Sequence, residues 1–424
     1  MRSLAILFFF AACLFAEVKT LTLRQALDLA LAQNPDILLA RLDQQKARAQ
    51  VTVTRDPFIP KVFAGSGAAY TYGFPSSIEG SAPAIVQVKG QMAIFNRPLN
   101  YQVAQSNEAA RGAAVDVGKR QDEVIYRVAS LYLDAEQAAR SLDAVQKQTA
   151  SLQRVRELMD LRVAEGRDLS IESRKANLSV LRANQHLDSL SLDLLNAEGA
   201  LGLAIGLGPD DRVRAATEER APLTVTQSEE VSIENALENS KDLKSLASNM
   251  QAKLLEIKSY QAERLPKINL VAQYSLFAKY TYQAYFTRFQ RNNAQLGVSV
   301  DIPLLVGRSG TALVSQSQAD IEKIRIEVGR TRARLTNDLR AAYQNLKRAE
   351  TGREIARADL DLSREELTLD LAQMDEGRLP LAKVEAARAA ENEKWLAYYE
   401  AQHTADVARL NVLRQSGTLE AAIR

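Results

Sequence analysis

Histidine and cysteine, which supply most metal ligands and nucleophile–base pairs, are scarce in this chain of 424 residues. It holds only His186, His403 and Cys13. Ordinary zinc sites and Cys–His nucleophiles need more of these residues. No Ser–His–Asp arrangement can be argued from two isolated histidines. The sequence therefore predicts no catalytic, cofactor or metal site, and indicates a protein that is not an enzyme.

Charged residues gather instead around two matching triplets, Glu165-Gly166-Arg167 and Glu376-Gly377-Arg378. Further charges flank them, namely Asp168, Glu172, Asp375, Lys383 and Glu385. Grouped carboxylates concentrate negative potential and attract cations, and arginine can bind carboxylates through charge-assisted hydrogen bonds. The alternative is that each is a solvated charge at a helix end, where exposed pairs contribute little.

The overall composition is that of a folded, helical chain. Hydrophobic residues make up 46% and charged residues 25%, with 54 basic against 52 acidic side chains. This balance argues against a nucleic-acid partner, which would require a basic excess or patch. Only 19 glycines and 11 prolines interrupt the chain, which favours long helices.

Matching residues recur at an offset of 211. Tyr132 matches Tyr343, the two Glu-Gly-Arg triplets match each other, and Gly206 matches Gly417. The segments starting at Leu21 and Val231 are also similar, with Thr22 and Ser232 as candidate N-caps. We predict a first structural repeat over 17–206, a connector over 207–230, a second repeat over 231–417 and a tail over 418–424.

Each predicted repeat carries a long helical hairpin. Apolar and small residues recur in steps of four and three from Val124 to Leu152, and the same seam reappears 211 residues later. This is the period of left-handed coiled-coil packing. Gly166 and Gly377 are predicted at the hairpin tips, because a tight reversal between helices favours glycine with positive φ.

Four segments alternate apolar and polar residues instead, which predicts strands near 61–73, 84–96, 267–280 and 294–303. This pattern fits either hairpins of a soluble sheet or transmembrane β-strands. Four strands cannot close a barrel alone, and open strand edges are not tolerated in lipid. In a membrane, other subunits would complete the barrel, and a trimer would supply 12 strands.

The amino end predicts export. Arg2 is followed by an apolar run that ends at Ala16, which is typical of a signal peptide over 1–16. Cleavage after Ala16 and lipidation of Cys13 both remain open. No later segment has the 18 consecutive apolar residues of a transmembrane helix.

The sequence resembles the outer-membrane efflux protein family, the TolC-like channels. The opening Leu21-Thr22-Leu23-(x)2-Ala26-Leu27-(x)6-Asn34-Pro35-Asp36 carries the resemblance. So do the paired Glu-Gly-Arg triplets and the repeated order helix, strand, strand, helix. The resemblance extends over residues 21–417.

The resemblance implies a mainly α-helical fold with a transmembrane β-barrel portion. Long antiparallel hairpins would form a trimeric α-barrel across the periplasm, and four strands per protomer would join a 12-stranded barrel in the outer-membrane lipid. The connector and both ends would form an equatorial region. A homotrimer of this kind would be a passive duct that joins an inner-membrane pump (RND, ABC or MFS type) through a periplasmic adaptor docked at the tips.

The resemblance also suggests where a gate would lie. In the family prototype, aspartates just past the second tip glycine ring the periplasmic mouth. Alignment on Gly377 without gaps places Lys383 and Ala386 at those positions, so this chain departs from the pattern. The candidate tip and gate residues are therefore Glu165, Gly166, Arg167, Asp168, Glu172, Asp375, Glu376, Gly377, Arg378, Lys383 and Glu385.

Two functions follow as hypotheses. The first is the outer-membrane channel of a tripartite efflux or type I secretion system. The second is a periplasmic coiled-coil structural or adaptor protein that does not enter the membrane. An adaptor would carry a lipoyl-like all-β module between its hairpin arms, and no such module is evident in the sequence.

Overall fold

The computed structural model describes residues 18–66, 84–216, 223–277, 292–304 and 307–423. The predicted signal peptide, including Cys13, lies outside these residues. The chain divides into two compact units. Unit 1 holds residues 1–39, 118–240 and 332–424, and unit 2 holds residues 40–117 and 241–331.

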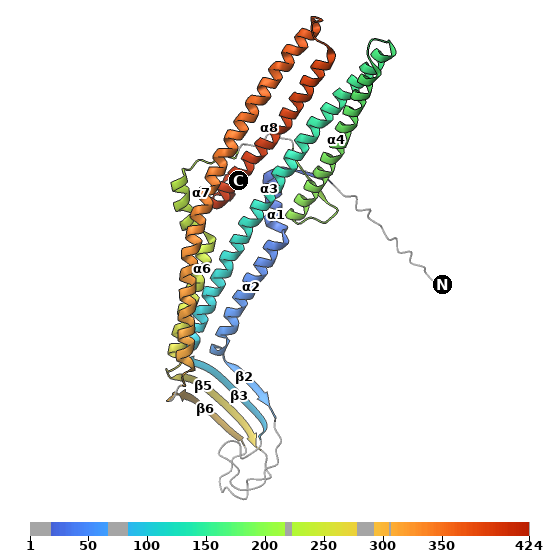
Figure 1. Ribbon diagram of the computed structural model, residues 1–424. Coiled ribbons are helices and arrows are strands. Elements are labelled where there is room, and N and C mark those ends of the chain that lie inside the picture. The colour runs from blue at the N-terminus through green and yellow to red at the C-terminus, as the bar shows by residue number, and fades with distance from the viewer. Residues whose placement is uncertain (1–17, 67–83, 217–222, 278–291, 305–306, 424) are drawn as a thin grey trace, which may run out of the picture. The chain divides into compact units, whose positions relative to one another are not determined.

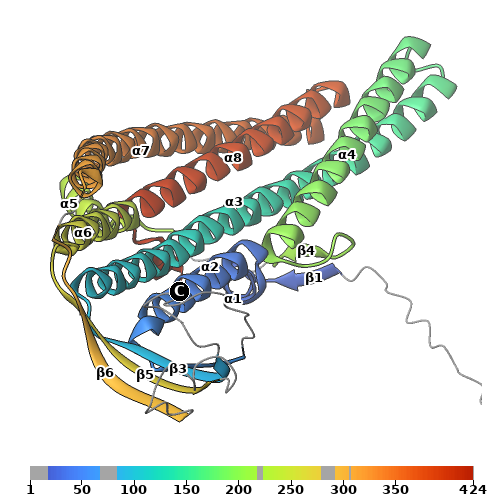
Figure 2. The same cartoon turned by 90° about the horizontal axis from the view of Figure 1, so that it is seen from below.

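Two long helical hairpins contribute most of unit 1. Helix α3 (Arg97–Ala164) runs antiparallel to α4 (Ser170–Ile205), and α7 (Ser309–Asp375) runs antiparallel to α8 (Leu381–Ser416) (Figures 1 and 2). The parts of α3 and α7 before residues 118 and 332 belong to unit 2. With 68 residues, α3 is roughly 100 Å long. Among the described helices, none has the length and apolar character needed to cross a membrane.

The apolar seam predicted on α3 is the face along which this helix packs against its neighbours. Val124, Val128, Ala135 and Val145 follow the predicted spacing and are buried. The matching seam on α7 buries Leu339, Ala342, Leu346 and Leu360. Burial of these side chains, each contributing about 0.8 kcal/mol per CH₂, supplies stability that helix propensity alone does not.

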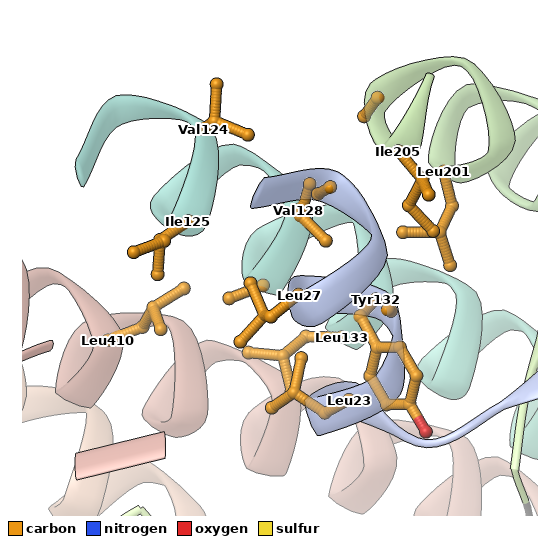
Figure 3. Packing of buried hydrophobic residues seen from close by; sticks show 14 of the residues in the cluster. Leu23, Leu27, Val124, Ile125, Val128, Tyr132, Leu133, Leu201, Ile205 and Leu410 are labelled. Carbon is orange, nitrogen blue, oxygen red and sulfur yellow. The ribbon is translucent and has the colours of Figure 1, made fainter. Parts of the chain in front are cut away.

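The main core of unit 1 lies where α1 (Leu23–Gln33) packs between the two hairpins (Figure 3). Leu27 and Val128 meet in this core, where they pack with Leu201 of α4 and Leu410 of α8. Thr22 caps α1 with a capping box, since its side chain and that of Gln25 bond to each other's backbone N–H groups. The predicted N-cap of this helix is confirmed.

The predicted N-cap in the second repeat is wrong. Helix α5 (Glu229–Asn239) begins four residues earlier than predicted, and its N-cap Ser228 accepts the hydrogen bond from the Val231 N–H group. Two glutamates in the first turn, Glu229 and Glu230, favour this earlier start because they complement the helix dipole. Ser232 lies within the helix and is buried, 2.7 Å from the Tyr343 hydroxyl.

The predicted connector and tail both contain regular structure. Strand β1 (Val18–Leu21) pairs in parallel with β4 (Arg212–Ala215), and β4 lies against α4 (Figure 2). A short helix, α9 (Leu419–Ile423), follows Gly417.

Unit 2 contains the four-stranded sheet. Its strands are β2 (Lys61–Gly65), β3 (Ala84–Phe95), β5 (Lys267–Phe277) and β6 (Asn292–Asp301). Their order is β2-β3-β5-β6, and each neighbouring pair is antiparallel (Figure 1). Helices α2 (Pro35–Arg55), with a 3-10 turn at Asp56–Phe58, and α6 (Lys241–Ala262) precede β2 and β5. Residues 67–73 and 278–280 of the predicted strands lie outside the described part.

The strand register sorts the side chains onto two faces. Leu270 pairs with Met92 on one side and Val298 on the other, so these apolar residues share a face. The opposite face carries the pairs Lys89–Gln273 and Gln273–Gln295. One face of the sheet is therefore largely apolar and the other largely polar.

Candidate functional site at the hairpin tips

Each hairpin reverses in a five-residue loop that contains one glycine in the left-handed region. In the first tip, α3 ends at Ala164, α4 begins at Ser170, and Gly166 has φ of 74°. In the second tip, α7 ends at Asp375, α8 begins at Leu381, and Gly377 has φ of 72°. An L side chain is strained in this region, which explains glycine at both positions.

The two tips share one hydrogen-bonding pattern. Gly166 N–H donates to Val163 O at 3.0 Å and Arg167 N–H to Arg162 O at 2.9 Å. The second tip repeats both bonds from Gly377 and Arg378, each at 2.9 Å. This Schellman motif satisfies carbonyls that a helix end would otherwise leave open.

Replacement of Gly377 by alanine should weaken the second tip by about 1 kcal/mol, because alanine is strained at positive φ. Hydrogen exchange of the tip amides measures this loss. The control is Gly352→Ala in the interior of α7, where a new Cβ meets nothing within 4 Å. That change should stabilise its helix by about 0.5–1 kcal/mol. If Gly377→Ala and Gly352→Ala changed stability by the same amount in the same direction, positive φ would not explain the glycine at 377.

Each tip arginine forms an ion pair with the glutamate of its own loop. The Arg167–Glu165 distance is 3.2 Å and the Arg378–Glu376 distance is 3.0 Å. All four side chains are more than half exposed, so each pair contributes at most about 1 kcal/mol. The other first-tip acids also have basic partners: Asp168 lies 2.6 Å from Arg162 and Glu172 lies 2.8 Å from Lys175.

The charges at the start of α8 differ from one another in burial. Lys383 is exposed, and it forms no ion pair with the described part of the chain. Glu385 is only 9% exposed, and its Oε1 lies 3.0 Å from a guanidinium nitrogen of Arg388. Burial raises the pKa of Glu385, while Arg388 and then Arg154 of α3 oppose the rise.

The raised pKa of Glu385 has a definite consequence for stability. The folded state favours the protonated carboxyl, so this contribution is present below the ordinary pKa and is lost as pH rises through the raised value. Thermal unfolding followed by circular dichroism should show that Glu385→Gln loses less stability between pH 4 and pH 7 than the unsubstituted protein. The control is Glu376→Gln, whose carboxylate is exposed. An unchanged pH dependence in Glu385→Gln would contradict the assignment.

Polar contacts along α8 were not predicted from the sequence. His403 Nε2 lies 2.7 Å from Asp134 of α3, and Arg409 lies 2.9 Å from Glu350 of α7. Arg409 also pairs with Asp406 at 3.0 Å, and both side chains are largely buried. Helix α8 is thus bonded to both α3 and α7. The sequence signal that could have indicated these bonds is the position of His403 and Arg409 on the face of α8 that packs against other helices.

The matching tyrosines of the two halves have matching roles. The Tyr132 hydroxyl donates to Leu21 O and accepts from Ala216 N–H, both at 3.2 Å. The Tyr343 hydroxyl donates to Gln227 O at 3.0 Å. Each tyrosine therefore joins its long helix to the segment between the halves. The offset of 211 identified the two residues as equivalent but did not indicate this role.

These features define a protein of two similar halves, each with a long helical hairpin and two strands. The family model described as outer membrane efflux protein matches residues 26–207 and 232–418. Because these ranges cover most of the chain, the protein belongs to the outer membrane efflux protein family. None of the curated protein sequences compared with it is significantly similar.

Solved structures show the same fold at low sequence identity. A membrane protein from Pseudomonas aeruginosa matches with a TM-score of 0.76 and 15% identity, over 95% of this chain and 91% of its own. The Campylobacter jejuni CmeC outer membrane channel matches with a TM-score of 0.75 and 15% identity, over 94% and 86%. The outer membrane protein VceC from Vibrio cholerae matches with a TM-score of 0.72 and 14% identity, over 93% and 96%.

Family membership confirms several predictions. The protein is an outer-membrane efflux channel by family, located in the outer membrane and extending into the periplasm. Its family is one of transport proteins rather than enzymes.

Proposed function

We propose that the protein is a homotrimeric outer-membrane channel of a tripartite efflux or type I secretion system. It conducts substrates passively to the exterior, from a periplasmic adaptor joined to an inner-membrane pump of RND, ABC or MFS type. Three copies enclose an α-helical barrel and a 12-stranded β-barrel. The observation that carries this proposal is a pair of apolar stripes, on α4 and α7, that stay exposed among the residues the structure describes.

The first stripe lies on α7. Ile355, Leu362 and Leu369 are spaced by seven residues and remain 60%, 57% and 62% exposed. They are separate from the buried seam of the same helix, which holds Leu339, Leu346 and Leu360. A second seam with coiled-coil spacing supports packing against a helix of another chain.

The second stripe lies on α4. Its exposed apolar residues occupy two heptad positions three residues apart, with polar residues at 185 and 188, and are Ile171, Leu178, Leu181, Leu192 and Leu195. Because α4 and α7 belong to different hairpins, α4 of one protomer and α7 of the next can alternate around a closed ring. Such a ring buries both stripes.

The sheet supports the same assembly. Within the described residues, β2 and β6 are its edge strands, and each has one unpaired edge. Unpaired backbone groups are costly in lipid, so a sheet that spans the membrane must close on itself. Pairing of β6 with β2 of the next protomer closes three sheets into one barrel.

The tips form the periplasmic gate and the docking site of the adaptor. In a trimer, the acids at the tips repeat three times around the mouth and favour cations there. The double variant Glu165→Gln with Glu376→Gln should lower the cation-to-anion permeability ratio in planar bilayers. The matched variant Arg167→Gln with Arg378→Gln should raise it. If neither variant moves the ratio, the acidic mouth is excluded.

Membrane fractionation tests the proposal against a periplasmic coiled-coil protein. The mature chain should sediment with the outer membrane and should require detergent for extraction, because the apolar face of the sheet contacts lipid. Recovery of the full-length mature chain as a soluble periplasmic monomer would exclude the channel.

A further inference from the structure

Positive charge is concentrated in unit 2. The sequence ranges of this unit, 40–117 and 241–331, hold 21 lysines and arginines against 12 acidic residues, although the whole chain is nearly neutral. The excess is specific to unit 2, since the sequence ranges of unit 1 hold more acidic than basic residues. A basic surface of this kind attracts an anionic partner.

One exposed arginine lies at each of the four junctions between the sheet and its helices. Arg55 ends α2 before β2, and Arg97 begins α3 after β3. Arg264 lies between α6 and β5, and Arg308 lies between β6 and α7. We call these four residues the junction arginines.

The strand register places all four junctions at one end of the sheet. Lys61, the first residue of β2, pairs with Gln91 near the end of β3. Lys267, the first residue of β5, pairs with Asp301, the last residue of β6. The junction arginines therefore lie in one row across the sheet rather than on opposite ends.

The junction arginines are available to an outside partner. All four are exposed, and none forms an ion pair with the residues that the structure describes. The nearby Lys61 differs, because it is paired with Asp56. Asp301 accepts hydrogen bonds from Asn269 and Ser299, at 3.3 and 3.5 Å. Asp56 and Asp301, two of the three acidic residues at these junctions, therefore have other partners. The third is Glu263.

The surface beside this row is apolar. Val62, Ile94, Val300 and Ile302 lie at the same end of the sheet and are each at least half exposed. A row of cations at the border of an apolar surface is the arrangement that suits a lipid interface, with the apolar side chains in the acyl region and the guanidinium groups among the headgroups.

We propose that the junction arginines bind the phosphate groups of anionic phospholipids at the periplasmic surface of the outer membrane. This inference rests on the proposed function, in which the sheet spans that membrane. The planar guanidinium binds phosphate oxygens with two parallel hydrogen bonds, and arginine loses little hydration on binding. With three copies, the arginines form a collar that fixes the depth of the barrel.

Lipid retention measures this binding directly. The full mature protein is purified in detergent with an equimolar excess of phosphatidylglycerol and phosphatidylcholine, and the retained lipids are counted by mass spectrometry. We expect about fivefold enrichment of phosphatidylglycerol, since one basic residue near an anionic surface contributes roughly that factor. The quadruple variant Arg55→Gln, Arg97→Gln, Arg264→Gln, Arg308→Gln should retain both lipids nearly equally.

A matched control removes four exposed arginines of unit 1, by Arg24→Gln, Arg182→Gln, Arg332→Gln and Arg348→Gln, and should keep the enrichment. In the unsubstituted protein, 1 M NaCl should abolish it through screening, which tests the inference even if the quadruple variant fails to fold. Equal retention of the two lipids by the unsubstituted protein would overturn the inference, as would undiminished enrichment in a folded quadruple variant.

Two further outcomes separate this inference from others. If the quadruple variant keeps its lipid preference but loses anion permeability, the arginines line the passage and the lipid assignment is wrong. If the unsubstituted protein is soluble without detergent and retains neither lipid, the proposed channel itself fails.

Discussion

Replacement of Leu296 by arginine is expected to prevent most of the protein from entering the membrane. Leu296 lies in the middle of β6, is 79% exposed and pairs with Ala272 on the apolar face. Arginine on a lipid-facing position near the bilayer midplane costs about 2–4 kcal/mol. The cost recurs in each of three subunits, so the fraction recovered in the outer membrane should fall by at least tenfold.

The neighbouring residue provides the control. Gln295 lies on the same strand but pairs with Gln273 on the polar face. Because successive side chains point to opposite faces, Gln295→Arg should face the water-filled lumen and leave insertion nearly unchanged. Equal losses in the two variants would show that the apolar face of the sheet does not contact lipid.

Charges placed on the α7 stripe should separate the subunits. The triple variant Ile355→Glu, Leu362→Glu, Leu369→Glu removes three side chains that each contribute about 1.5–3 kcal/mol when buried. It also places three carboxylates in each interface, where an unpaired charge is unfavourable. The mass of the detergent-extracted protein, measured by native mass spectrometry, should change from three chains to one.

The control adds the same charges elsewhere on α7. Lys347, Arg357 and Thr368 are exposed, and none lies three, four or seven residues from a member of the stripe, so they lie off its face of the helix. Their replacement by glutamate should leave the trimer intact. A trimer that survives the stripe variant would mean that α7 does not form the subunit interface.

The repetitive features of the structure could be predicted from the sequence, because each rests on local chemistry. Gly166 and Gly377 could be placed at the tips because few residues other than glycine tolerate positive φ. The seam through Val124 and Val128 could be predicted because its spacing is that of a coiled coil.

Features that depend on long-range packing could not be predicted. Ser232 and Ser228 are both acceptable N-caps, and the choice between them follows from the contact of Ser232 with Tyr343, 111 residues away. The burial of Glu385 likewise depends on the position of α8 beside its neighbours. In a list of charged candidates, Glu385 could not be distinguished from the exposed Glu376 by sequence alone.

The stripes on α4 and α7 could be predicted only in part. Their coiled-coil spacing is present in the sequence, but each helix carries apolar residues on more than one face. Only the structure separates Leu360, which is 3% exposed, from Leu362, which is 57% exposed. The unburied set then points to a partner outside the chain.

Single-channel recording in planar bilayers tests the central claim most directly. The purified mature protein should produce discrete, long-lived conductance steps, which the stripe variant abolishes and its control retains. Protein that contains folded hairpins but never produces such steps, with or without the tip substitutions, would contradict the account of this chain as a trimeric outer-membrane channel.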